Sequence, residues 1–265
     1  MDYLDPYQSG FRPGFGTETA LVALLDDLWR EWDEGSASIL VLFDLLAAFD
    51  IIDHGILLGW LQGMGVGGIV LSWFTSFLCS RSLSVLIGGE RSNHRPLLYG
   101  VLQVSVLSPL LFNIYMKPLD EIIRHHGLRY HQYADDTQLY VSARGELSVA
   151  VSSLSQCLEA VRSWMGSNGL KLNPSKTEWL WVWGLLVQGE LPPLVLDGVA
   201  LPQTDPVHNL GVLLDSQLLL KEQVVVMARR AFAQLRVVHQ LRPFLDQRSL
   251  LTVTHALVTS HLDYC

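Results

Sequence analysis

The chain has 265 residues, 49% of them hydrophobic, so it is long and apolar enough to bury a core, which excludes a disordered tail. Its formal net charge of −8 at pH 7 speaks against a basic protein that binds nucleic acid mainly by covering phosphates with lysine and arginine. The three cysteines lie far apart without CxxC spacing, so the sequence encodes neither a zinc site nor a disulfide framework.

An apolar stretch at residues 38–61 has the length of a membrane span but carries four polar interruptions, at Asp44, Asp50, Asp53 and His54. Charges at membrane depth are costly, so a strand and a helix are expected there and no membrane association. The N-terminus lacks a basic region followed by an apolar stretch, so no secretory signal is predicted. We expect an intracellular protein, in the nucleus or the cytoplasm or both, and the sequence leaves its oligomeric state open.

The first third of the chain predicts a helix, a buried strand and two short helices. Residues 17–34 carry an apolar stripe at helical spacing, with Thr17 as the expected N-cap. Residues 38–43 (SILVLF) form a short continuous apolar run that ends at Asp44, the pattern of a buried strand. Glycines interrupt the helical pattern of residues 51–79, which predicts two helices around a turn.

The middle of the chain predicts a hairpin and one helix. Residues 83–87 and 94–101 flank Gly88-Gly89, a turn signal between two strand-like runs. From Leu107 onward the apolar positions follow helical spacing, and this helix is expected to run to about Gly127.

A second hairpin is expected next, with acidic residues at its tip. Residues 128–133 and 137–142 are strand-like and surround Ala134-Asp135-Asp136. Residues 147–165 then place apolar side chains four, three, four, three and four positions apart, which predicts a long amphipathic helix.

The last third predicts another hairpin, a looser region and a basic helix. Residues 170–183 are a hairpin candidate, with turn chemistry at residues 173–175. Residues 220–241 carry an apolar stripe, and six basic residues face only two acidic ones between Lys221 and Arg248. This segment is the best candidate for gripping a nucleic-acid backbone, and an ordinary solvated helix face is the alternative. Between the hairpin candidate and this helix lies a looser region, marked by Pro192, Pro193, Pro202 and Pro206.

The order of these elements predicts an α+β fold, with an antiparallel sheet and helices on one face of it. Two acidic sites stand where strands end. Asp44 follows the first strand, and Asp135 and Asp136 lie at a hairpin tip, so the three carboxylates converge if the two strands are neighbours. Such a group can hold Mg²⁺ ions for phosphoryl transfer. The alternative is that the paired aspartates only form a turn.

A second group of possible metal ligands consists of Asp50, Asp53 and His54. We interpret these residues as the start of a helix, with Asp53 as its N-cap or as a partner of the helix dipole.

Longer motifs carry a resemblance to a known family. Gln132 to Leu139 (QYADDTQL) closely resembles the YADD active-site hairpin of reverse transcriptases, and Phe43 to Asp50 (FDLLAAFD) resembles the first metal-binding strand of LINE-type elements. Further segments follow in the family's order: residues 8–21, 105–116, 164–165 with 170–178, 209–212 and 255–265. The chain thus resembles the reverse transcriptase domain of a non-LTR (LINE-type) retrotransposon, in a truncated copy.

The resemblance implies a right-hand polymerase palm. Residues 1–36 would form part of the fingers and the fingers-to-palm segment, residues 37–190 the palm with the active site, and residues 191–265 a primer-grip hairpin and a truncated helical thumb. The implied activity is RNA-directed DNA polymerisation, with an RNA template, a DNA primer and deoxynucleoside triphosphates as partners. Two Mg²⁺ or Mn²⁺ ions would be bound by the catalytic carboxylates of Asp44, Asp135 and Asp136.

Five more site residues follow from matching positions of the motifs. Phe49 would be the steric gate against a ribose 2′-OH, or a core aromatic, or both. Gln103 would contact the incoming nucleotide or the template, and Tyr133 and Ala134 would lie at the nucleotide site. Lys176 would assist departure of pyrophosphate, with a solvated surface lysine as the alternative.

The sequence departs from the family pattern at Leu102-Gln103-Val104, where the family usually has Pro-Gln-Gly. Glycine allows close approach of the backbone to a substrate, which a β-branched residue restricts. The alternative function is therefore a catalytically inactive retrotransposon relic, at most a nucleic-acid-binding module. A Mg²⁺-dependent phosphohydrolase that uses the same aspartates is a third reading.

Overall fold

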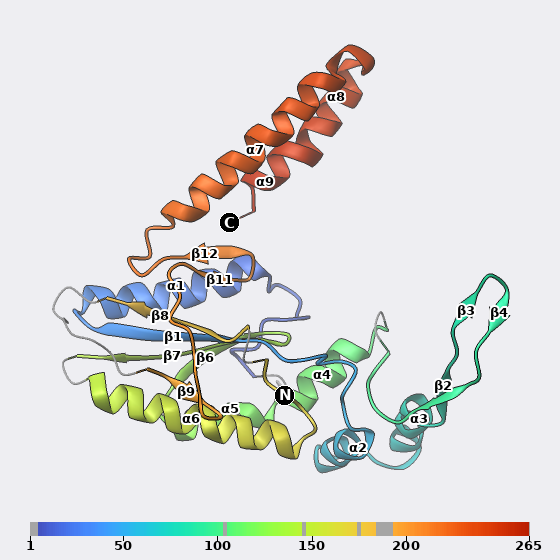
Figure 1. Cartoon of the computed structure of the whole chain (residues 1–265). Helices are drawn as coiled ribbons and strands as arrows, with labels where there is room; N and C mark the ends of the chain where they lie inside the picture. Colours follow the sequence, from blue (N-terminus) through green and yellow to red (C-terminus); the bar gives the residue numbers. More distant parts are fainter. Residues whose placement is uncertain (1–4, 103–104, 145–146, 174–175, 184–192, 265) are drawn as a thin grey trace.

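The structure is a computed structural model that describes residues 5–102, 105–144, 147–173, 176–183 and 193–264. Its centre is a four-stranded antiparallel sheet in the order β6-β7-β1-β8 (Figure 1). The strands are β1 (Ala37–Phe43), β6 (Arg129–Tyr133), β7 (Asp136–Ala143) and β8 (Glu178–Val182). The predicted antiparallel α+β architecture is confirmed, as are the first strand and the acidic hairpin.

Helices cover both faces of this sheet rather than the one face that was expected. Alternate residues of β1 enter two separate cores, and every residue of this strand is buried. Ile39, Val41 and Phe43 belong to the core under α5 (Pro118–His125) and α6 (Leu147–Ser167). Leu40 and Leu42 belong to the core under α1 (Thr17–Asp33) (Figure 1). A continuous apolar strand is the pattern of a sheet covered on both sides.

The first helix, α1, matches its predicted range but not its predicted cap. Its N-cap is Gly16, and Thr17 is already helical. The Gly16 amide donates to Oγ1 of Thr19 at 2.8 Å, so the side chain three residues on satisfies the end of the helix. Leu21, Leu24, Leu25 and Leu28 form its buried stripe.

Two short helices follow as predicted, α2 (His54–Gly63) and α3 (Gly68–Leu78). Asp53 is the N-cap of α2, where its side chain accepts a hydrogen bond of 2.9 Å from the amide of Ile56. This confirms the helix-start interpretation of Asp53.

The predicted glycine hairpin is present as a long two-part arm. It pairs β3 (Leu86–Ile87) with β4 (Glu90–Arg91), and β2 (Arg81–Leu83) with β5 (Arg95–Leu97). Gly88 and Gly89 form its turn with φ values of 59° and 89°, which glycine adopts without steric cost. Together with α2 and α3, this arm extends away from the sheet (Figure 1).

The helix predicted from Leu107 to Gly127 is wrong as a single element. It is two helices, α4 (Ser108–Met116) and α5, which meet at Lys117. Pro118 has no amide hydrogen to donate to the preceding turn, so it begins a new helix instead of continuing the first. The long helix at residues 147–165 is confirmed as α6.

The hairpin predicted at residues 170–183 is also wrong. Among its described residues only Glu178–Val182 form a strand, β8, and this strand pairs with β1, not with residues 170–173. Leu172 instead forms an isolated bridge with Leu45. The turn residues Pro174 and Ser175 lie outside the described residues. When β8 pairs with β1, both edges of the buried strand β1 are hydrogen-bonded, by β7 on one side and β8 on the other. A local hairpin would leave one edge of β1 without a partner.

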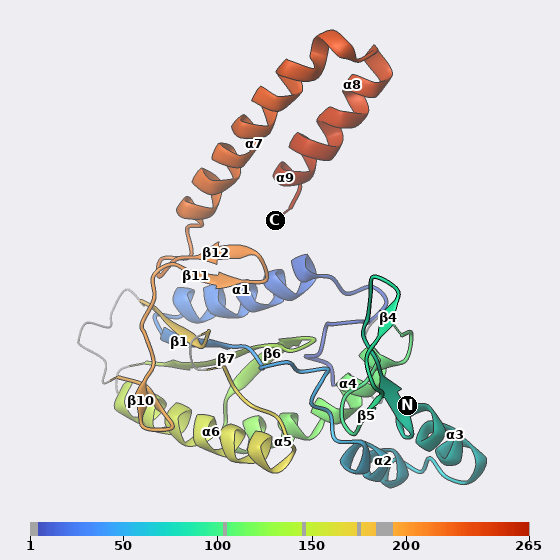
Figure 2. The same ribbon diagram turned by 45° about the vertical axis from the view of Figure 1, so that its right-hand side comes forward.

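The C-terminal third contains two small hairpins and a helical arm. The hairpins pair β9 (Val195–Leu196) with β10 (Val199–Ala200), and β11 (Val207–Asn209) with β12 (Val212–Leu214). The arm is α7 (Lys221–Leu241), which folds back through η1 (Arg242–Phe244), α8 (Gln247–Thr254), η2 (His255–Thr259) and α9 (Ser260–Leu262). It projects beyond the sheet and α1 (Figures 1 and 2).

The predicted helix at residues 220–241 is confirmed as α7, although its apolar stripe is only partly buried. Ala231 and Val238 pack with Val258 in a small core of the arm, whereas Val224 is 61% exposed. The β11–β12 hairpin shares the core of α1 and the sheet. Among the described residues, no helix is both long and apolar enough to span a bilayer. The exact domain boundaries at residues 36 and 190 stay predictions.

Candidate active site

Three aspartates gather at one edge of the central sheet. β1 and β7 are antiparallel neighbours in a register that pairs Phe43 with Thr137. The next position of this register places Asp44, which directly follows β1, beside Asp136, the first residue of β7. Asp135 precedes it in the turn that joins β6 to β7. The expected adjacency of the two acidic strand ends is therefore confirmed.

The turn that presents these carboxylates is tight. Tyr133 pairs with Asp136, which leaves Ala134 and Asp135 as the two central turn residues. Ala134 has a φ of 58°, whereas Asp135 has no positive φ, the pattern of a type II′ hairpin turn. A positive φ costs an L-residue about 1–2 kcal/mol, so contacts outside the turn must hold Ala134 in place.

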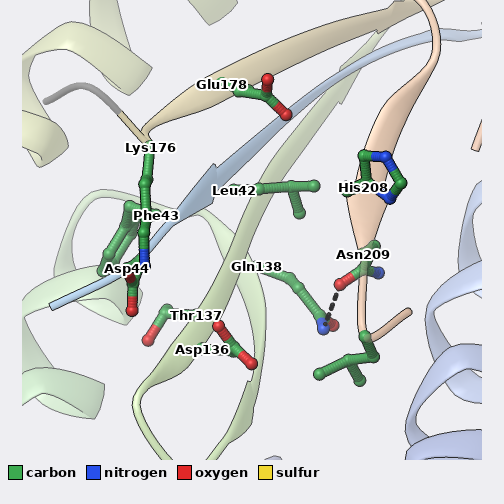
Figure 3. A pocket seen from close by; sticks show the side chains of 11 residues that line it. Leu42, Phe43, Asp44, Asp136, Thr137, Gln138, Lys176, Glu178, His208 and Asn209 are labelled. Atoms are coloured by element: carbon green, nitrogen blue, oxygen red, sulfur yellow. Dashed lines mark hydrogen bonds and ion pairs between the residues drawn. The ribbon is translucent and has the colours of Figure 1, made fainter. Parts of the chain in front are cut away.

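A pocket of about 360 Å³ opens beside the aspartates (Figure 3). Its floor comes from β1 and β7, and its opposite wall comes from β11 and the residue that follows it. Asp44, Asp136 and Lys176 lie at one end, and Asn209 lies across from them (Figure 3). The sheet and the β11–β12 hairpin thus form a cleft next to the acidic edge.

Lys176 reaches into this site from the segment before β8. Its Nζ donates to Oδ2 of Asp44 at 2.7 Å, and this bond with the attraction of the carboxylate raises the pKa of Lys176. The lysine side chain is 68% exposed, so this ion pair lies open to solvent on the lysine side. The structure thus brings Lys176 together with the predicted metal-binding residues.

The carboxylates repel one another in their partly dehydrated setting. Desolvation, followed by repulsion from Asp135 and Asp44, raises the pKa of Asp136 to about 6, and Lys176 opposes the shift. Desolvation and the charge of Asp44 likewise raise the pKa of Asp135. Asp136 as a residue is exposed, so repulsion within the cluster of like charges acts on its pKa beside the loss of hydration. A cation at this edge would relieve the repulsion.

The donor chemistry fits Mg²⁺, but the ligand set is not preformed. Within the described ranges, no three acidic, histidine or cysteine side chains are arranged to hold a metal ion. Mg²⁺ commonly takes one or two carboxylates and completes its shell with water and substrate phosphates. Asp44 and Asp136, which both line the pocket, are suitable for that role without a third protein ligand.

The remaining predicted site residues fall into different places. Phe49 is half-buried and stacks on Phe112 with ring centroids 4.6 Å apart, so it packs as a core aromatic. Tyr133 is half-buried and Ala134 buried, both in the acidic hairpin. Gln103, with the unusual Val104, lies outside the described residues.

Sequence reasoning missed a pair of buried amides in the pocket wall. Nε2 of Gln138 on β7 donates to Oδ1 of Asn209 on β11 at 2.7 Å (Figure 3). The other amide atoms, Oε1 of Gln138 and Nδ2 of Asn209, are buried without a hydrogen-bond partner in the part of the chain that the structure describes. The motif match at residues 209–212 pointed to the hairpin, but nothing in the sequence pointed to this pairing.

A comparison with protein families decides the relationship. The model described as "Reverse transcriptase (RNA-dependent DNA polymerase)" matches residues 2–214. The chain belongs to the reverse transcriptase family. The matched region contains the acidic site and the β11–β12 hairpin. The pocket of this reverse transcriptase therefore lies inside the part of the chain that matches the family. The family predicted from the motifs is confirmed.

Relatives from mobile elements support the predicted LINE-type resemblance. The chain is 27% identical over 255 residues to the "Probable RNA-directed DNA polymerase from transposon BS" of Drosophila melanogaster, which covers 94% of this chain and 28% of that protein. It is 26% identical over 218 residues to the "RNA-directed DNA polymerase from mobile element jockey" of the same species, covering 80% and 23%. This reverse transcriptase chain thus spans less than a third of either relative.

Solved structures show the same fold at low identity. Apo telomerase from Candida tropicalis, truncated from its C-terminal domain, superposes with a TM-score of 0.55 at 12% identity, covering 77% of this chain and 38% of that one. Telomerase from Candida albicans with a fragment of telomeric RNA gives 0.51 at 12% identity, covering 74% and 34%. These matches confirm the palm-like α+β fold of this reverse transcriptase.

Proposed function

We propose that this chain is the polymerase part of a LINE-type RNA-directed DNA polymerase, which extends a DNA primer on an RNA template from deoxynucleoside triphosphates. The observation that carries the proposal is the meeting of Asp44 and Asp136 at adjacent strand ends, beside a cleft walled by the β11–β12 hairpin. Family membership supports the same reaction class.

The carboxylates would hold two Mg²⁺ or Mn²⁺ ions, with Asp44 and Asp136 facing the pocket and Asp135 next to them. When bound, such a pair supplies the charge that activates the primer 3′-hydroxyl and stabilises the departing pyrophosphate. Lys176 contacts Oδ2 of Asp44, so a metal ion would compete with its ammonium group for this carboxylate. The ammonium group, turned from Asp44 toward the nucleotide, would neutralise or protonate the leaving pyrophosphate.

The other site residues orient the substrates in this proposal. The cleft between β7 and β11 would receive the primer end, and the buried hydrogen bond between Gln138 and Asn209 would hold its two sides together. Phe49 would act as steric gate from its stack on Phe112, and Tyr133, Ala134 and Gln103 would lie along the nucleotide. The chain would act inside the cell, in the nucleus or the cytoplasm.

Primer extension by the purified chain on an RNA template tests this proposal. Extension that depends on Mg²⁺ and vanishes in Asp136→Asn and Asp44→Asn supports it. The matched control is Glu159→Gln, which removes an exposed carboxylate from α6 and leaves the pocket untouched. Extension that persists at full rate in both aspartate variants would contradict the assignment.

One observation favours a second function, a nucleic-acid-binding module without polymerase activity. Arg229 and Arg236 line a shallow hollow on α7 with Phe232, whose side chain is 65% exposed. A cationic groove with an exposed aromatic ring suits single-stranded nucleic acid. Salt-dependent binding that Phe232→Ala and Arg236→Gln weaken, with no extension by any variant, would favour this function.

A further inference from the structure

We propose that Gln8 is a positioning residue for the acidic hairpin, and that it sets the direction in which Asp135 and Asp136 present their carboxylates. We call Gln8, Gly10 and Asn113 together the Gln8 clamp; hydrogen bonds join Gln8 to Gly10 and Gly10 to Asn113. The role assigned to the clamp rests on the proposed function. Its contacts can be followed from the turn outward.

The turn residue Ala134 is the point of contact. Its amide donates to Oε1 of Gln8 at 3.2 Å, and Nε2 of Gln8 lies 3.5 Å from its carbonyl oxygen. Ala134 is buried, and a buried amide at the tip of a hairpin finds no partner in the ladder. Gln8 therefore supplies both halves of the hydrogen bonding that water supplies to an exposed turn.

The clamp is itself held rigidly. Oε1 of Gln8 also accepts from the amide of Gly10 at 2.7 Å. Gln8 is buried, with an exposed fraction of 3%. The backbone of Tyr7 and Ser9 pairs with Gln132 through two bonds of 2.8 Å, parallel to β6. The N-terminal segment therefore moves with the strand that leads into the turn.

Gly10 allows this close approach. A Cβ atom at position 10 would lie 2.3 Å from the amide nitrogen of Ala134 and 2.9 Å from its Cα. Both atoms belong to the backbone, so a side chain here would displace the turn. From the other side, Nδ2 of Asn113 on α4 donates to the carbonyl oxygen of Gly10 at 3.0 Å.

The clamp explains how Ala134 keeps a φ of 58°. A non-glycine residue stays in this region only where its surroundings over-determine it. Gln8 holds the amide of Ala134 and Gly10 leaves room for it, so the turn is fixed immediately before the two aspartates. Residues that orient metal ligands without touching the metal typically change metal affinity by about 10- to 100-fold when removed.

The experiment compares Gln8→Leu with a matched variant, Gln223→Leu, in the full chain. Gln223 is also buried, and its Oε1 also accepts from a backbone amide, that of Leu213 at 3.1 Å. Three quantities are measured: the thermal midpoint, Mn²⁺ affinity by titration, and hydrogen exchange of the peptide that contains Ala134. A glutamine with a purely structural role would change only the thermal midpoint.

We expect Gln8→Leu to weaken Mn²⁺ binding by about tenfold and to accelerate exchange at the Ala134 amide. Gln223→Leu should lower the thermal midpoint without either effect. Gly10→Ala should reproduce Gln8→Leu, because it displaces the same amide. Unchanged exchange at Ala134 and unchanged Mn²⁺ affinity in Gln8→Leu would overturn the proposal.

The same samples separate this proposal from the proposed function. If the wild-type chain neither extends primers nor binds Mn²⁺, the polymerase function fails, and the exchange of Ala134 alone decides whether the clamp exists. If the wild-type chain is active and Gln8→Leu keeps both its metal affinity and its hairpin protection, the clamp fails while the polymerase function stands.

Discussion

Lys176 donates a hydrogen bond of 2.7 Å to Asp44 across the end of β1, so a cationic side chain already lies against the first carboxylate of the site. The two residues are 132 positions apart in sequence. This pairing partly neutralises the acidic edge of the sheet. It also places an ammonium group next to the position where phosphate charge would develop.

Replacing Lys176 tests its role in the departure of pyrophosphate. Lys176→Met is expected to lower the maximal extension rate by about 100-fold, because a positioned proton donor contributes about 10²–10⁴ in rate. Primer–template affinity should remain unchanged. Lys117→Met, which removes an exposed lysine at the junction of α4 and α5, is the control and should extend normally. Equal rates for the two variants would reduce Lys176 to a surface lysine.

The raised pKa of Asp136 predicts a pH-dependent gain in stability on its removal. The pKa of the Asp136 carboxyl is raised from 3.8 to about 6 in the folded state. The free energy of unfolding therefore falls as the pH rises through this window. Without metal, Asp136→Asn should therefore raise the thermal midpoint by about 2 °C at pH 7.5. At pH 3.5 the difference should vanish. A variant that is less stable than the wild type at pH 7.5 would refute the repulsive cluster.

Phe49 is expected to have two separable roles. Phe49→Val should admit ribonucleotides, because it shortens the side chain proposed to face the sugar. The variant should also lose about 1–3 kcal/mol of folding free energy, since the stack on Phe112 is removed. Competition between deoxyribonucleotides and ribonucleotides in the extension assay measures the first effect. Unchanged sugar selectivity in a destabilised variant would leave Phe49 as a core aromatic only.

The buried pair of Gln138 and Asn209 predicts a strong coupling between β7 and β11. Gln138→Leu alone should cost about 1–3 kcal/mol, because it leaves the Asn209 amide buried without this partner. The double variant, with Asn209→Leu as well, should cost less than the sum of the single changes. Denaturant unfolding of the four proteins gives the coupling energy, and strict additivity would show that the two amides do not depend on each other.

The sequence departure at Leu102-Gln103-Val104 predicts a gain of activity when it is reversed. If Val104 restricts the approach of a nucleotide, Val104→Gly together with Leu102→Pro should raise the extension rate, by lowering the KM for nucleotide more than by altering primer binding. Single-nucleotide incorporation at graded nucleotide concentrations measures this change. An unchanged KM in the double variant would mean that these residues do not limit the reaction.

The sequence predicted the acidic edge because the signals there are local. A continuous apolar run ending at Asp44 and a hairpin ending in two aspartates describe β1, β6 and β7, and the family motif placed them side by side. The contacts that complete the site are not local. Gln8 and Ala134 are 126 residues apart, and Gln138 and Asn209 are 71 apart, so no spacing or periodicity encodes them.

Two local patterns were misread for a physical reason. The apolar spacing of α4 and α5 continues across Pro118, so periodicity alone joins two helices that the missing proline amide separates. The turn chemistry at residues 173–175 suggested a hairpin, but β8 gains more by pairing with a fully buried strand, β1. In both cases a weak local signal was overruled by backbone chemistry or tertiary packing.

The most direct test of the central claim is a crystal structure of the chain with primer–template and Mn²⁺, in which anomalous scattering locates the metal. The account predicts Mn²⁺ between the carboxylates of Asp44 and Asp136, with Lys176 released from Asp44 toward the nucleotide phosphates. Mn²⁺ bound elsewhere, with Lys176 still paired to Asp44 in the presence of substrate, would contradict it.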